Sequence, residues 1–120
     1  MNHVMLDILF RDEHICVINK PAGLAVHKGW AAAEHYALDL LRDQLGQWVY
    51  PVHRLDQPTS GVLLFALSSA MASVLCESFR EHHVAKRYVA LVRGVPPLHL
   101  RLDHPIKDEH GERRDAVTVL

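Results

Sequence analysis

The sequence offers few means of stabilising a chain other than a hydrophobic core. Its 120 residues include two cysteines, Cys16 and Cys76, which are too few and too far apart for a disulfide framework or a zinc site. No apolar run is long enough to span a bilayer. Residues 1–10 lack a basic region followed by an apolar block, so no secretory signal is expected. The default expectation is a reducing, cytoplasmic location without membrane contact.

A surplus of positive charge is also missing. Lysine and arginine total 13 against 14 aspartates and glutamates, a net charge of -1 with histidine neutral. Nucleic-acid-binding proteins usually present a basic surface, so this balance weighs against such a role. Basic residues do gather locally, although charge alone favours an ordinary solvated face. The local groups are Arg80, Lys86, Arg87 and Arg93, and then Arg113 with Arg114.

The composition is that of a folded domain. Hydrophobic residues make up 49% and charged residues 22%, and the length suits one domain at most. Alternating or continuous apolar residues predict strands. The predicted strands cover residues 6–10, 15–18, 48–52, 62–67, 86–92 and 116–120.

Two helices are expected between these strands. Leu38, Leu41 and Leu45 recur at helical spacing, and Gly46 suits the end of that helix. Ser68 or Ser69 can cap a second helix. This helix would place Ala72, Leu75 and Phe79 on one face. The pattern predicts an α+β fold with a mixed, mostly antiparallel sheet flanked by helices.

The predicted last strand, residues 116–120, has no evident partner. An unpaired strand would leave an exposed edge. The chain also stops within this strand. We therefore expect the 120 residues to be one partial domain, a fragment of a longer protein.

The most informative stretch is the predicted loop His53–Gly61, which contains an imidazole, a guanidinium, a carboxylate and two hydroxyls. Functional groups concentrate on loops held by rigid elements. A kinase catalytic loop is excluded because Leu55 separates Asp56 from His-Arg. Metal binding by His53 and Asp56 lacks a convincing third ligand. An aspartate nucleophile is chemically reasonable, but the residues alone favour a loop aspartate that accepts backbone hydrogen bonds.

This loop resembles the signature loop of the RluA-type pseudouridine synthases, with the pattern His-Arg-Leu-Asp-x-x-Thr-Ser-Gly intact. Val17–His27 resembles the family's Lys-Pro-x-Gly segment, and Lys86–Gly94 resembles its Lys-x-Tyr strand. Three motifs in the right order are more specific than one. Finer features resemble the branch that modifies the tRNA acceptor stem. They are Gly46-Gln47, Trp30 and Ser60–Leu64.

The resemblance implies an enzyme that isomerises uridine to pseudouridine in structured RNA. It makes Asp56 the essential catalytic residue and places Tyr88 against the target uracil. Arg54 would occupy the space of the flipped nucleotide. Lys86 and Arg87 are further candidates for RNA contacts, while Lys20 is expected to shape the hairpin end with Pro21 and is also a candidate RNA contact. Support of the loop is expected from His53, Thr59, Ser60 and Gly61.

The resemblance also implies the expected partners, and the sequence departs from the family pattern at one point. Neither cofactor nor metal is required, the partner is tRNA or alternatively ribosomal RNA, and a monomer is expected. The family completes its pocket with an arginine from a later segment that this sequence lacks. Arg113 and Arg114 do not match its pattern. A non-catalytic RNA-binding module and a poorly folded remnant therefore stay open as alternatives.

Overall fold

A computed structural model of the chain describes residues 4–29, 33–108 and 110–120. The chain separates into two compact units, Met1–Lys86 and Arg87–Leu120. Each unit is described by itself. Trp30, one of the residues that resemble the tRNA branch, lies outside the described residues.

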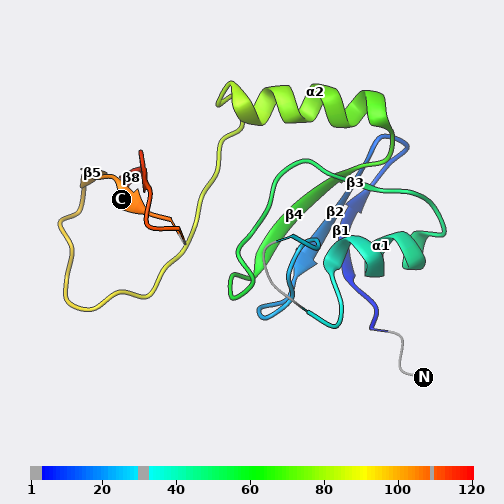
Figure 1. Cartoon of the computed structure of the whole chain (residues 1–120), viewed down its shortest axis with the longest axis horizontal. Helices are drawn as coiled ribbons and strands as arrows, with labels where there is room; N and C mark the ends of the chain where they lie inside the picture. The colour runs from blue at the N-terminus through cyan, green and yellow to red at the C-terminus, as the bar shows by residue number, and fades with distance from the viewer. Residues whose placement is uncertain (1–3, 30–32, 109) are drawn as a thin grey trace. The chain divides into compact units, whose positions relative to one another are not determined.

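The first unit is built on a four-stranded sheet with the order β1-β2-β4-β3, in which every neighbouring pair is antiparallel (Figure 1). The predicted strands and helices of this unit are confirmed, with the strand around residue 50 shorter than expected. The elements are β1 (Asp7–Arg11), β2 (Ile15–Lys20), α1 (Ala37–Leu45), β3 (Tyr50–Pro51), β4 (Gly61–Ala66) and α2 (Ser69–Arg80).

Local side-chain chemistry sets several of these boundaries. The Asp12 carboxylate accepts hydrogen bonds from the backbone N–H groups of Ile15 and His14, which closes the turn between β1 and β2. These two bonds lower the pKa of Asp12. Helix α1 ends at Gly46, whose φ of 64° is the left-handed conformation that glycine adopts without strain. The Ser68 side chain caps α2 by accepting a hydrogen bond from the N–H of Met71.

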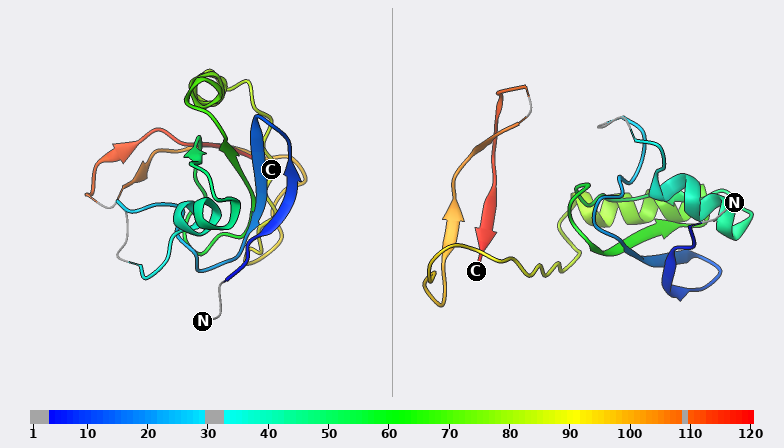
Figure 2. Two further views of the ribbon diagram at one scale, coloured as in Figure 1. Left: turned by 90° about the vertical axis from the view of Figure 1, so that its right-hand side faces the viewer. Right: turned by 90° about the horizontal axis from the view of Figure 1, so that it is seen from below.

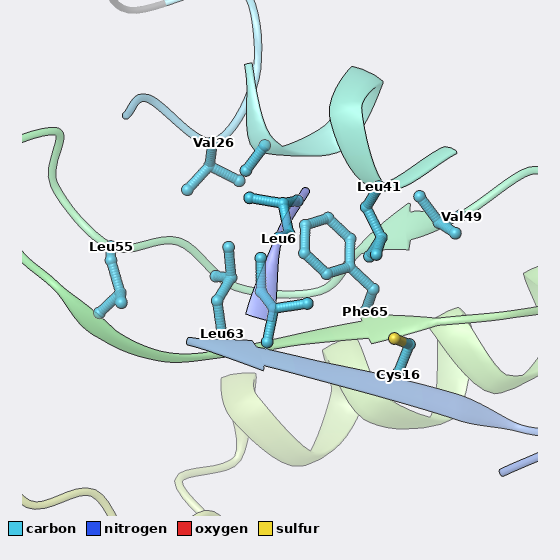
Figure 3. Packing of buried hydrophobic residues seen from close by; sticks show 10 residues of the cluster. Leu6, Cys16, Val26, Leu41, Val49, Leu55, Leu63 and Phe65 are labelled. Atoms are coloured by element: carbon cyan, nitrogen blue, oxygen red, sulfur yellow. The ribbon is translucent and has the colours of Figure 1, made fainter. Parts of the chain in front are cut away.

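The hydrophobic core lies between α1 and one face of the sheet (Figure 2, left). Alternate residues of β2 and β4 point into it, and cross-strand pairs bring Ile18 opposite Leu63 and Cys16 opposite Phe65. Leu41 of α1 packs on these side chains from the other side (Figure 3). Helix α2 packs against β4 and β3 instead and has no fully buried residue.

The second unit consists of an extended segment followed by short strand pairs. The strand predicted over 116–120 is present, but the expectation that it has no partner is wrong. Val117–Val119 pairs antiparallel with Arg101–Asp103. The four strands are β5 (Arg101–Asp103), β6 (Ile106–Lys107), β7 (Arg113–Arg114) and β8 (Val117–Val119), with β6 paired to β7.

The strand predicted over residues 86–92 is absent. The described residues supply no neighbouring strand for this segment, and Val89 and Leu91 are fully exposed, at 99% and 103%. Alternation of apolar residues gives a segment the side chains of a strand, but a strand also requires a hydrogen-bonded neighbour. The predicted α+β class with a sheet flanked by helices is confirmed by the first unit.

Candidate active site

The loop from β3 to β4 carries Asp56 on the surface of the first unit. The Asp56 side chain is 73% exposed, and one of its oxygens lies 3.3 Å from the Arg54 guanidinium, which is 45% exposed. An exposed ion pair of this kind contributes little to stability. Both charged groups are therefore open to a ligand that approaches the loop.

Lys20, the last residue of β2, connects this loop to the segment that follows β2. Its side chain is fully buried, and the ammonium donates hydrogen bonds to three backbone carbonyls: those of Leu24 at 2.7 Å, Pro21 at 3.0 Å and Gln57 at 3.1 Å. Burial lowers the pKa of Lys20, and the Asp56 carboxylate opposes that shift. Lys20 thus ties the segment after β2 to the residue that follows Asp56.

A second connection joins the same two loops. The N–H of Gly23 donates to the carbonyl of Gln57 at 2.7 Å, and the Gln57 side-chain amide donates back to the carbonyl of Gly23 at 3.1 Å. Both loops lie at the end of the sheet where β2 ends and β4 begins (Figure 1). Gly23 has a φ of 91°, which a residue with a Cβ rarely adopts. The Lys-Pro-x-Gly segment therefore supports the Asp56 loop.

Leu55 anchors the other side of Asp56. It is buried within the core cluster, although both of its sequence neighbours are exposed (Figure 3). The N–H of Thr59 donates to the carbonyl of Asp56 at 2.9 Å, which makes a turn of residues 56–59. Asp56 is thus held between a buried side chain before it and two backbone connections after it.

The predicted loop-support residues act in different ways. Among the described residues, the hydroxyls of Thr59 and Ser60 make no hydrogen bond, so the backbone supplies the turn. Gly61 has a φ of 131° where the loop enters β4, a conformation that favours glycine. The imidazole of His53 accepts a hydrogen bond from the N–H of Leu64 at 3.0 Å and stacks on Phe79.

The structure brings only some of the predicted site residues together. Lys20 does not reach the surface expected of an RNA contact, because its ammonium is buried against backbone carbonyls. Lys86 is exposed in the first unit and acts electrostatically on His53. Arg87 and Tyr88 are exposed and belong to the second unit, so their place in a site with Asp56 stays a prediction.

Sequence reasoning missed three residues that shape the site. Gln57 accepts from Lys20 through its carbonyl and pairs with Gly23, yet it occupies a variable position of the signature pattern. Leu55 belongs to the signature pattern, but the pattern does not show that it is buried. A single leucine within a polar loop is the signal that could have marked a core anchor. Phe79 was placed on a helix face, and its contact with His53 had no signal in the sequence.

Within the described ranges, no three histidine, cysteine, aspartate or glutamate side chains gather where they could hold an ion. No helix in the same ranges has both the length and the apolar character needed to cross a bilayer.

The chain belongs to the RNA pseudouridylate synthase family. The family's sequence profile matches residues 14–119, which include every site residue described above. The predicted membership in this family is confirmed.

Similar curated proteins point to one branch of that family. The chain is 50% identical to the tRNA pseudouridine synthase C of Haemophilus influenzae, over 95% of this chain and 53% of that protein. It is 48% identical to the protein of the same name from Vibrio cholerae, over 88% of this chain and 44% of that protein. The chain spans about half the length of the curated relatives it matches.

Solved structures agree on the fold. The human RNA pseudouridylate synthase domain containing 4 superposes with a TM-score of 0.70 at 30% identity, over 94% of this chain and 50% of that chain. The human RNA pseudouridylate synthase domain containing 1 gives a TM-score of 0.77 at 24% identity, over 99% and 52% respectively. The second likeness supports the fold alone.

Proposed function

We propose that this protein isomerises uridine to pseudouridine in structured RNA, with tRNA as the first substrate to test and Asp56 as the catalytic residue. The observation that carries the proposal is the exposed Asp56 carboxylate on a loop that is fastened on both sides. Names of the relatives from Haemophilus influenzae and Vibrio cholerae favour tRNA over ribosomal RNA. Within tRNA, we expect the modified uridine to lie in the acceptor stem.

The chemistry needs a carboxylate rather than a cofactor. The reaction breaks the bond between C1′ of ribose and N1 of uracil and forms a bond from C1′ to C5. N1 gains a proton and C5 loses one, so the product is an isomer of the substrate. A carboxylate can attack the sugar or the base, or stabilise positive charge at C1′. Rigid attachment of the Asp56 loop supports this role because a reacting group must be held in place.

Substrate binding falls to the groups beside Asp56. A stacked uridine must be flipped out before Asp56 can reach it. The planar guanidinium of Arg54 can stack on bases and bind phosphate, and its partial exposure makes it accessible to RNA. Tyr88 is proposed to lie against the uracil and to remove the C5 proton. Lys86 and Arg87 would contact the RNA backbone. We expect the protein to act as a monomer in the cytoplasm.

The test uses tRNA that carries tritium at C5 of uridine, because isomerisation releases that tritium to water. We expect Asp56→Asn to abolish release. The matched control is Asp43→Asn, which removes one exposed carboxylate from α1. Release by Asp56→Asn at the rate of the unchanged chain would refute the catalytic role of Asp56.

The same experiment separates the alternative functions. Binding of tRNA that weakens with salt, without tritium release by the unchanged chain, would favour an RNA-binding module. Absence of a cooperative melting transition would favour a poorly folded remnant. The buried core of the first unit argues for cooperative folding.

A further inference from the structure

His53 stands where strand β3 stops and the Asp56 loop begins. Tyr50 pairs with Ala66 and Pro51 with Phe65, so a longer β3 would next bring Val52 opposite Leu64. The ladder ends instead, and the N–H of Leu64 donates to Nε2 of His53 at 3.0 Å. The imidazole thus replaces the backbone carbonyl that the missing strand residue would have offered.

This bond specifies the chemical state of the imidazole. A ring nitrogen that accepts a hydrogen bond carries no proton, so the single proton of the neutral ring is on Nδ1. A doubly protonated imidazolium has two donors and no acceptor. Protonation of His53 would therefore break the bond to Leu64 and leave two N–H groups facing each other.

The surroundings of His53 keep the ring in place and neutral. Phe79 of α2 stacks on it with ring centroids 4.6 Å apart and planes 14° from parallel. Burial, together with the charge of Lys86, lowers the pKa of His53. Two arginines next to these residues in the sequence are in ion pairs, Arg54 with Asp56 and Arg80 with Glu77 of α2 and with Glu81, which follows the helix.

We propose that neutral His53 is a positioning residue for Asp56, acting through its acceptor bond to the Leu64 N–H. The bond fixes where the loop leaves the sheet, three residues before Asp56, while Leu55 and Gln57 fix the residues on either side of Asp56. The catalytic consequence rests on the function proposed above; the link between His53 and the loop does not.

Two variants of His53 separate the acceptor from the stacking. His53→Gln keeps an oxygen that can accept from Leu64 and cannot titrate. His53→Phe keeps an aromatic ring against Phe79 and removes the acceptor. His83→Gln is the matched control, because His83 is exposed and its backbone N–H, not its imidazole, is hydrogen-bonded within the described part of the chain, to Ser78.

The first measurement is nuclear magnetic resonance of the chain across a pH titration. We expect the Nδ1–H tautomer at neutral pH and a Leu64 amide protected from exchange. As pH falls through the pKa of His53, that protection and the amide resonances of residues 54–57 should change together. His53→Gln should abolish the pH response, His53→Phe should lose the protection at every pH, and His83→Gln should behave as the unchanged chain.

The second measurement is the pH profile of tritium release. We expect release to fall about tenfold per pH unit below the pKa of His53, and His53→Gln to remove this acid limb while retaining release at neutral pH. An Nε2–H tautomer, a protected Leu64 amide in His53→Phe, or loop resonances that ignore the titration would overturn the proposal. If neither the unchanged chain nor any variant releases tritium, the result counts against the proposed function. The role of His53 is then decided by the resonance data.

Discussion

Replacement of Lys20 by methionine should destabilise the first unit and loosen the Asp56 loop. Methionine retains the length and apolar character of the lysine stem, so packing changes little. The ammonium is lost, and with it the hydrogen bonds to the carbonyls of Pro21, Leu24 and Gln57. The variant therefore measures the connection between the two loops rather than the filling of the core.

The expected magnitude follows from opposing contributions. Hydrogen bonds to a charged group contribute about 1.5–3 kcal/mol each, and an orphaned buried carbonyl costs about 1–3 kcal/mol. Removing the buried ammonium recovers its desolvation cost, which is about several kcal/mol. Pro21 and Gln57 are exposed, so water can reach their carbonyls, whereas Leu24 is half-buried. Because these contributions oppose one another, we expect Lys20→Met to lower the free energy of unfolding by about 2–3 kcal/mol.

Urea denaturation followed by tryptophan fluorescence and circular dichroism is the assay, with Lys28→Met as the control because Lys28 is exposed. In a domain of this size the loss corresponds to a fall in Tm of roughly 8–24 °C. The denaturant slope should stay unchanged. A change in unfolding free energy below about 0.5 kcal/mol, equal to that of Lys28→Met, would refute the reasoning.

Four further outcomes test other parts of the structure. Phe65→Ala should lower the unfolding free energy by about 3–5 kcal/mol, because Phe65 is fully buried in the core; a loss below about 1 kcal/mol would contradict that packing. Ser68→Ala should cost about 1 kcal/mol through loss of the α2 cap, whereas Ser69→Ala should cost less, and equal effects would argue against the cap. Lowering the pH below 6.5 should destabilise the unchanged chain more than His53→Gln in urea melts. The pKa of His53 is lowered by folding, so the unfolded state binds the extra proton, and parallel losses would exclude this linkage. Arg54→Gln should reduce the slope of log affinity for tRNA against log salt by about one phosphate contact, measured by fluorescence anisotropy, and an unchanged slope would remove Arg54 from the RNA interface.

Predictions from the sequence succeeded where the cause lies within a few residues. Short uninterrupted apolar runs predicted β2 and β4, and leucine spacing with Gly46 predicted α1 and its end. The Ser68 cap was one of two candidates, because a cap needs only its own helix. The signature loop selected Asp56 through its immediate neighbours, and its catalytic role stays a prediction.

Predictions failed where the structure of a segment depends on a partner that is distant in the sequence. Residues 86–92 alternate as a strand should, yet the described residues give them no neighbour, whereas the strand over 117–119 found a partner in 101–103. Lys20 shapes the hairpin end as expected, but the RNA contact also considered for it is not supported, because its buried ammonium has acceptors that include a carbonyl 37 residues away. No spacing rule reveals which carbonyl a lysine will reach.

The sequence by itself therefore determined the family and the local elements of the first unit, and it selected Asp56 as the catalytic candidate, since each depends on short-range patterns. Tertiary structure alone decided how Asp56 is held. Lys20, Leu55 and His53 support its loop from β2, the core and β4, and they meet there because the antiparallel sheet brings its ends together. Hydrogen bonds and burial across such separations arise from the folded chain, and no local pattern encodes them.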